Sequence, residues 1–175
     1  MAFSAGPKKP DISSAGLYLG IDPGLSCTGY ALLERTERGP VLHEGGVIRS
    51  TTRRSLAERV HEIGSGMREL IEEFGPQVMA VEQIFSLGRN PKSALLMAHA
   101  RGAILWTAAE RDIPVIHFMP TQVKRLLTGS GRASKEQIQH AVRNELHLRQ
   151  VPKPNDVADA AAVALCVYHS ICFAA

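Results

Sequence analysis

Four acidic residues occupy positions where a folded protein has little reason to place a negative charge. Asp22 ends the apolar segment LYLGID, and Glu82 ends the apolar segment VMAVE. Asp156 and Asp159 lie in the nearly apolar segment NDVADAAAVAL, at a spacing that puts both on one side of a helix. Carboxylates are almost never buried unless they are paired or bound to a cation. The four acids are therefore candidate metal ligands.

Each of these acids also has a simpler structural explanation. Asp22 precedes a Pro-Gly pair, where an aspartate commonly stabilises a turn. Asp156 suits the first turn of a helix, where the helix dipole favours a negative charge. Glu82 and Asp159 are harder to explain in this way. Four converging carboxylates would repel one another, and Mg²⁺ or Mn²⁺ would relieve the repulsion, so the set predicts a two-metal site for phosphoryl transfer.

Length and composition place these acids in an ordinary globular protein. The chain has 175 residues, of which 45% are hydrophobic and 21% charged, enough for one domain with a sizeable core. No apolar run approaches the roughly 18 residues of a membrane span, and the first residues do not form a signal peptide. Three cysteines without a C-x-x-C pair argue against a disulfide framework. We expect a cytoplasmic protein without a membrane partner, with a flexible basic tail over residues 1–16 and one domain over residues 17–175.

Positive charge is concentrated in the middle of the chain. Residues 83–149 carry ten Lys and Arg residues against four Asp and Glu residues, whereas both flanking segments are slightly acidic. This distribution is compatible with a face that binds a polyanion beside an acidic cluster. From charge alone, an ordinary solvated helix surface explains it equally well.

Apolar periodicity predicts the elements that would position these residues. Three short strands joined by turns indicate an antiparallel meander, and later strands alternate with helices, which is typical of an α/β fold with a mixed five-stranded sheet flanked by helices. A glycine pair at residues 45–46 suggests a β-bulge. The predicted strands are 17–22, 29–34, 41–48, 78–82 and 113–118, and the predicted helices are 56–74, 91–111, 122–127, 134–148 and 155–168.

Five segments resemble the successive blocks of a known family. LGIDPGLSCTGYALL, GGVIRS, VMAVEQIF, PTQVKRLLTGSGRASKEQI and DVADAAAVAL are similar, in order and spacing, to the blocks of the bacterial RuvC Holliday junction resolvases. The resemblance covers roughly residues 17–172. It implies the ribonuclease H-like fold and an endonuclease that makes paired symmetric nicks in four-way DNA junctions, leaving 5′-phosphate and 3′-hydroxyl ends.

The resemblance also implies roles for single residues. Asp22 would bridge two Mg²⁺ ions, for which Mn²⁺ could substitute, and Glu82 would be the ligand from the fourth strand. Asp156 and Asp159 would be the ligands from the last helix, although some relatives carry histidine at the first of these two positions.

Basic and aromatic residues would then contact the DNA. Lys124 and Lys135 match two lysines near the catalytic centre that contact the cleaved strand, and Phe85 matches an aromatic residue that stacks on bases at the junction centre. For each of the three, an ordinary surface or loop residue is the alternative interpretation. Further candidate contacts to DNA phosphates are Arg89, Lys92, Arg101 and Arg132.

The second predicted helix bears on the oligomeric state. Apolar residues cover more of its circumference than one core-facing stripe requires. This indicates either a partner helix or a fully covered internal helix. The resemblance implies a homodimer through this helix, which would present two sites to a junction of matching symmetry, and the RuvAB branch-migration complex as a partner.

Three other functions remain open from the sequence. A different ribonuclease H-like nuclease would cut RNA instead of a junction. An actin-like ATPase shares a hairpin resembling residues 20–24, but it needs a second domain for which 175 residues leave no room. A junction-binding module without cleavage is the third alternative, against which the intact acids argue.

Overall fold

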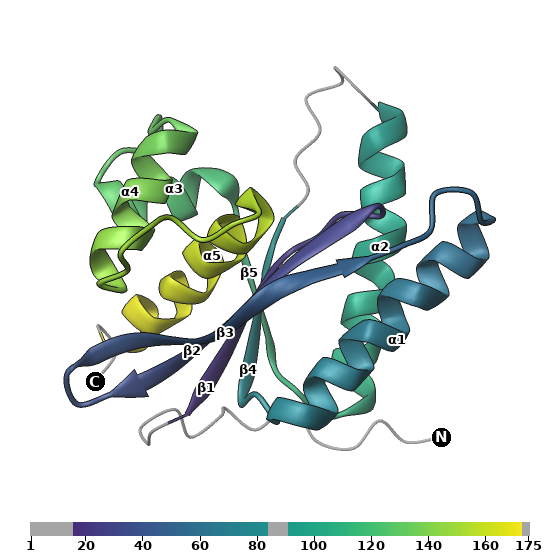
Figure 1. Ribbon diagram of the computed structural model, residues 1–175, viewed down its shortest axis with the longest axis horizontal. Coiled ribbons are helices and arrows are strands. Elements are labelled where there is room, and N and C mark those ends of the chain that lie inside the picture. Colours follow the sequence, from purple (N-terminus) through teal and green to yellow (C-terminus); the bar gives the residue numbers. More distant parts are fainter. Residues whose placement is uncertain (1–15, 84–90, 173–175) are drawn as a thin grey trace, which may run out of the picture.

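The computed structural model describes residues 16–83 and 91–172, so the predicted tail up to residue 15 lies outside the described residues. The described chain forms an α/β structure with one mixed sheet and helices on both of its faces (Figure 1). The strands are β1 (Leu17–Asp22), β2 (Cys27–Thr36), β3 (Gly39–Arg49), β4 (Val78–Glu82) and β5 (Val115–Phe118). The helices are α1 (Leu56–Phe74), α2 (Pro91–Glu110), α3 (Pro120–Thr128), α4 (Lys135–Glu145) and α5 (Asn155–Cys172).

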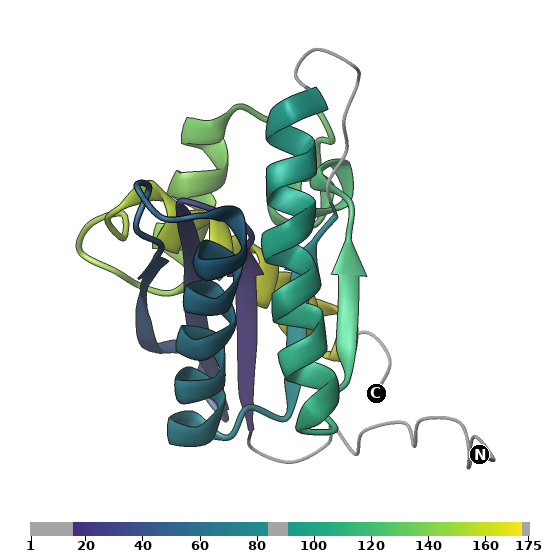
Figure 2. The same cartoon turned by 90° about the vertical axis from the view of Figure 1, so that its right-hand side faces the viewer.

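The sheet confirms the predicted meander followed by parallel strands. Its strand order is β3-β2-β1-β4-β5, with antiparallel pairing of β1 to β2 and of β2 to β3. Strand β1 pairs with β4 in parallel, and β4 pairs with β5 in parallel. The carboxyl ends of β1, β3, β4 and β5 therefore lie at one edge of the sheet. Figure 2 shows α1 and α2 beginning at this edge.

Side chains alternate between two hydrophobic cores, one on each face of the sheet. On one face, Tyr18 and Val78 pack with α3, α4 and the almost fully buried α5. On the other face, Leu19 and Met79 pack with α1 and α2. Since Asp22 and Glu82 have the parity of Tyr18 and Val78, both acids belong to the α5 face.

Two glycines allow α5 to lie directly on the sheet. A Cβ atom added to Gly20 would stand 2.2 Å from the backbone oxygen of Ala160, and one added to Gly29 would stand 2.1 Å from the backbone oxygen of Asp156. Glycine inside a strand often marks such a close approach of another backbone. The pair sets the distance between the helix and the strands β1 and β2.

The observed elements differ from the predicted ones mainly at their ends. Strands β2 and β3 are longer than predicted, because their pairing continues to a turn at residues 37–38. The predicted bulge at residues 45–46 is wrong: the register shifts between Leu32 and Leu33, so the extra residue on β3 is His43. Helices α1 and α4 begin with reciprocal capping boxes, in which Ser55 pairs with Glu58 and Ser134 pairs with Gln137.

No helix in the described part of the chain is long and apolar enough to cross a membrane.

Candidate metal-dependent active site

Two neighbouring parallel strands bring the first two acids together. Ile21 and Val81 are register partners on β1 and β4, and each is followed by the acid that ends its strand. Asp22 and Glu82 therefore stand side by side at the carboxyl edge of the sheet. They lie on the face of the sheet that α5 covers.

Helix α5 brings the other two acids to the same edge. Its first turn carries Asp156, whose backbone oxygen rests against Gly29, and Gly29 is the β2 partner of Asp22. Asp159 follows one turn later and stands close enough to both strand acids to shift their pKa values. The structure thus gathers all four predicted carboxylates into one electrostatically coupled cluster.

The cluster favours the protonated form of its most enclosed member. Burial, together with the negative charges of Glu82, Asp159 and Asp156, raises the pKa of Asp22 from 3.8 to about 7. Burial and then Asp159 also raise the pKa of Glu82, and Lys124 and Lys135 oppose that shift. Without a further cation, the negative charge of the cluster is only partly compensated.

Two lysines from the covering helices face these acids. The ammonium nitrogen Nζ of Lys135 donates a hydrogen bond of 2.7 Å to Oδ2 of Asp159. This bond is the main reason why the pKa of Lys135 is raised. Glu82, Asp159, Lys124 and Lys135 all line one open cavity of about 270 Å³, which is bounded by α3, α4 and α5. The two predicted lysines therefore share a cavity with two of the predicted acids.

The chemistry of these residues fits a hard divalent cation. Carboxylate oxygens are the donors that Mg²⁺ and Mn²⁺ prefer. A cation would stabilise the charged form of Asp22, whose pKa is raised first by burial and then by repulsion from the other acids. Among residues 16–83 and 91–172, no three acidic, histidine or cysteine side chains already form a closed ligand cage. Instead, Lys135 occupies one oxygen of Asp159. A bound metal would therefore have to compete with this lysine.

The other predicted DNA contacts are spread around this centre. Arg132 is exposed on the loop between α3 and α4, and Lys92 is exposed in the first turn of α2. Arg101 does not line the cavity of the acids; its Nη2 atom lies 2.8 Å from Nδ1 of His117, in a separate hollow beside Gln83. Phe85 and Arg89 lie outside the described residues.

Sequence reasoning did not find the neighbours of the site on its β3 side. The Cys27 side chain is hydrogen-bonded to Asp156, and burial together with that carboxylate raises the pKa of the thiol. Arg49 is the cross-strand partner of Cys27, and its charge opposes this shift. Both contacts arise from the pairing of β2 with β3. The available signal was that Arg49 directly follows the predicted strand 41–48, next to the hairpin that begins after Asp22.

A mixed sheet of this order, with acids at the ends of β1 and β4 and on the helix that crosses them, defines a ribonuclease H-like nuclease fold. The family follows from comparison with known proteins. The family model described as "Crossover junction endodeoxyribonuclease RuvC" matches residues 18–167, and the chain belongs to this family.

Individual relatives agree with this assignment over most of their length. The chain is 48% identical to the crossover junction endodeoxyribonuclease RuvC of Rhodopirellula baltica, over 89% of this chain and 88% of that protein. It is 43% identical to the RuvC of Moorella thermoacetica, over 86% of this chain and 89% of that protein.

Solved structures give the same result. A Thermus thermophilus RuvC structure matches with a TM-score of 0.82 and 32% identity, covering 90% of this chain and 96% of that one. T. thermophilus RuvC in complex with a Holliday junction substrate matches with a TM-score of 0.81 and 33% identity, covering 89% and 94%. The fold and the family predicted from the sequence are confirmed.

Proposed function

We propose that this chain is a metal-dependent endonuclease that resolves four-way (Holliday) DNA junctions by cutting two opposed strands symmetrically. Family membership supports the substrate and the reaction class. The observation that carries the proposal is the cluster of four carboxylates beside two lysines at the carboxyl edge of the sheet. A binding module without cleavage would not account for a cluster of acids whose charge two lysines compensate only in part.

The four carboxylates would hold the metal ions. Asp22 is central, because its pKa responds to all three other acids, and we propose that it is shared between two Mg²⁺ ions, with Mn²⁺ as a substitute. Bound there, the ions would activate water and stabilise the departing 3′ oxygen, which leaves 5′-phosphate and 3′-hydroxyl ends. Glu82, Asp156 and Asp159 complete the set of ligands.

The lysines have a separate task at the reacting phosphate. Lys124 and Lys135 face the acid cavity with positive charge, and Lys135 reaches Asp159 directly. We propose that both side chains stabilise the negative charge that develops on the phosphoryl oxygens during displacement. For this purpose Lys135 would leave Asp159 when metal and DNA bind.

The remaining DNA contacts follow the same logic. Arg132 and Lys92 are exposed near the ends of elements that border the site, where they can meet flanking phosphates. Arg101, beside Gln83, would act close to the segment that follows β4. Phe85 and Arg89 are proposed for base stacking and for a phosphate contact, respectively, on the family resemblance alone.

An uncovered face of α2 supports a homodimer. The helix buries Ala100, Ile104, Thr107 and Ala108 against its own core, while Leu95 is 64% exposed and Trp106 is 56% exposed. The alternative of a fully covered internal helix is therefore excluded for the described chain. A two-fold dimer through this face would direct two active sites at one junction. We also propose the RuvAB branch-migration complex as a partner, with family membership as its support.

Cleavage of a labelled, branch-mobile four-way junction tests the proposed function. Purified protein is incubated with the junction in Mg²⁺, Mn²⁺ or EDTA. The expected products are paired symmetric nicks that ligase can seal, absent in EDTA and absent with Asp22→Asn. Tight junction binding without cutting in either metal would contradict the proposal, and so would cutting of RNA in preference to the junction.

A further inference from the structure

The last residue of β3 and the loop that joins this strand to α1 have an unusual composition. Residues 49–55 read Arg-Ser-Thr-Thr-Arg-Arg-Ser, so every side chain is a hydrogen-bond donor and none is acidic or apolar. Six of these seven residues are exposed, Ser50 being the exception. Arg, Ser and Thr side chains are among the groups that bind nucleic-acid phosphates. The loop lies outside the basic segment 83–149 that the charge distribution singles out.

The loop is held in a defined shape. The Thr51 carbonyl accepts a hydrogen bond from the amide of Arg54, closing a turn. Glu62 of α1 accepts hydrogen bonds from the amide of Thr51 at 2.7 Å and from its hydroxyl at 3.1 Å, and it also pairs with Arg54 at 3.2 Å. Because Glu62 uses its charge on Arg54, it fixes the loop without neutralising the other arginines.

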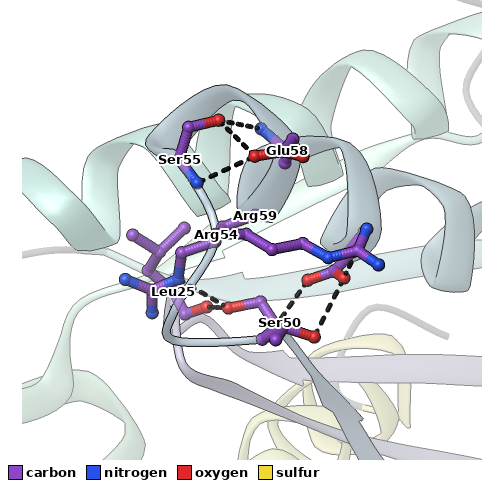
Figure 3. A network of polar contacts seen from close by, with 8 residues as sticks. Leu25, Ser50, Arg54, Ser55, Glu58 and Arg59 are labelled. Atoms are coloured by element: carbon purple, nitrogen blue, oxygen red, sulfur yellow. Dashed lines mark hydrogen bonds and ion pairs between the residues drawn. The ribbon is translucent and has the colours of Figure 1, made fainter.

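The same loop is bonded to the turn that follows Asp22. The hydroxyl of Ser50 donates to the Leu25 carbonyl at 2.5 Å, and the guanidinium of Arg59 bridges the hydroxyls of Ser50 and Ser26 at 3.0 and 2.8 Å. Figure 3 shows this network between the loop, the first turn of α1 and the turn carrying Leu25. The loop is therefore a fixed neighbour of the metal site on the β3 side.

Two arginine side chains and one threonine hydroxyl of this segment are not used in contacts within the described chain. Within the described parts of the chain, the side chains of Arg49, Thr52 and Arg53 have no hydrogen-bond or ion-pair partner. Arg49 is also the register partner of Cys27, which contacts Asp156. The acid cluster thus has free positive charge on its β3 side, opposite Lys124 and Lys135 on its α3 and α4 side.

We infer that residues 49–53 form a second binding surface for the DNA backbone, which holds the phosphates that flank the cleaved bond on the β3 side. This inference rests on the proposed junction cleavage and adds a substrate contact to it. Arg49 and Arg53 supply the charge, and Thr52 supplies a hydroxyl. The contact recognises phosphate charge and not base sequence, because an exposed loop at the sheet edge presents no helix or two-stranded ribbon that would fit into a groove of the DNA.

The salt dependence of junction binding tests this surface. Fluorescence anisotropy with a labelled four-way junction in EDTA measures the affinity of the full chain, Arg49→Gln, Arg53→Gln and the double variant. The matched control is Arg38→Gln, an exposed arginine in the turn at the opposite end of the sheet. We expect the slope of log affinity against log salt to fall by about 1 for each loop arginine removed, with several-fold weaker binding for the double variant at physiological salt. Arg38→Gln should leave both values unchanged.

The outcomes separate this inference from the proposed function. Phosphate-ethylation interference should lose contacts on one side of the cleavage position in the double variant and keep those on the other side. An unchanged salt slope and interference pattern in a double variant that unfolds at the wild-type temperature would overturn the loop contact and leave junction cleavage intact. A wild-type chain that neither prefers nor cuts the junction would overturn the proposed function, and this inference with it.

Discussion

Asp22 is a carboxylate in surroundings that favour its protonated form. Its folded pKa of about 7 exceeds its ordinary value of 3.8, so the metal-free folded state binds more protons than the unfolded state between these two pH values. The free energy of unfolding therefore falls as pH rises through this window, and the loss is complete above about pH 7. The residue that the proposed chemistry needs is thus destabilising until a cation binds.

Asp22→Asn should consequently stabilise the metal-free protein at high pH. We expect the variant to unfold at a higher temperature than the wild type in EDTA at pH 8, and at nearly the same temperature near pH 4, where Asp22 is protonated in the folded wild type. Adding Mg²⁺ at pH 8 should raise the unfolding temperature of the wild type more than that of the variant. Differential scanning calorimetry at both pH values measures this, and a variant that is less stable than the wild type at pH 8 in EDTA would contradict it.

Lys135 acts as a counter-charge while the cluster holds no metal. Its 2.7 Å bond to Asp159 places a positive charge where a divalent cation would otherwise act. Lys135→Met should lower the stability of the metal-free protein and increase the rise in unfolding temperature that Mg²⁺ produces, because the acids then repel one another without relief.

Lys124→Met is the matched comparison for this change. Lys124 lines the same cavity and lowers the pKa of Glu82, but it makes no ion pair with any acid in the described residues. Its effect on Mg²⁺-dependent stability should be smaller than that of Lys135→Met. Equal effects of the two variants on the unfolding temperature would contradict this prediction, because they would show that the ion pair with Asp159 does not determine the Mg²⁺-dependent stability.

At the scale of elements, the site depends on how closely α5 approaches β2. Gly29 has room for no side chain, since a Cβ atom there would stand 2.1 Å from the backbone oxygen of Asp156. Gly29→Ala must move the first turn of α5, at a cost of about 1–3 kcal/mol of stability, as is typical of overpacking. Because this turn carries Asp156, we expect junction cleavage to fall by more than junction binding.

A glycine without such a contact provides the control. Gly64 lies in α1, and a Cβ atom there would stand 3.7 Å from Ala103, an ordinary contact distance. Gly64→Ala should leave stability unchanged or increase it, because alanine is the better helix former. Chemical denaturation and single-turnover cleavage of both variants compare the two positions. Equal loss of cleavage in both would contradict the role of Gly29.

Features of the site that depend on one segment could be predicted from the sequence, whereas features that depend on two segments could not. The sequence predicted that Asp22 and Glu82 end apolar strands and that Asp156 and Asp159 share one side of a nearly apolar helix, because each of these patterns is local. The contact of Cys27 with Asp156 depends on how β2 meets α5, and the position of the loop from Arg49 depends on how β3 pairs with β2. Neither is encoded within one segment. The bulge was predicted at residues 45–46 and lies at His43 for the same reason, since the register depends on both paired strands.

At the scale of the whole molecule, α2 presents an apolar surface that the described part of the chain does not cover. Leu95 and Trp106 are more than half exposed, and both lie on the side of α2 away from Ile104, which is buried in the core. The Trp106 ring lies beneath the guanidinium of Arg68, 5.7 Å from its centroid, so an intrachain contact already orients it. A pre-ordered aromatic side chain loses little entropy on association and is typical of an interface anchor.

Trp106→Asp should therefore weaken the proposed dimer without unfolding the monomer. We expect its dissociation constant, measured by sedimentation velocity, to rise on the order of tenfold or more, as for loss of an interface anchor. Val41→Asp is the matched control, because Val41 is also about half exposed but lies on the sheet-edge strand β3, away from α2. Since one active site cuts one strand, the Trp106 variant should shift junction products from paired to single nicks at low protein concentration. A variant that stays dimeric, or that is monomeric yet still makes paired nicks, would contradict the assignment of α2 as the surface that joins two sites on one junction.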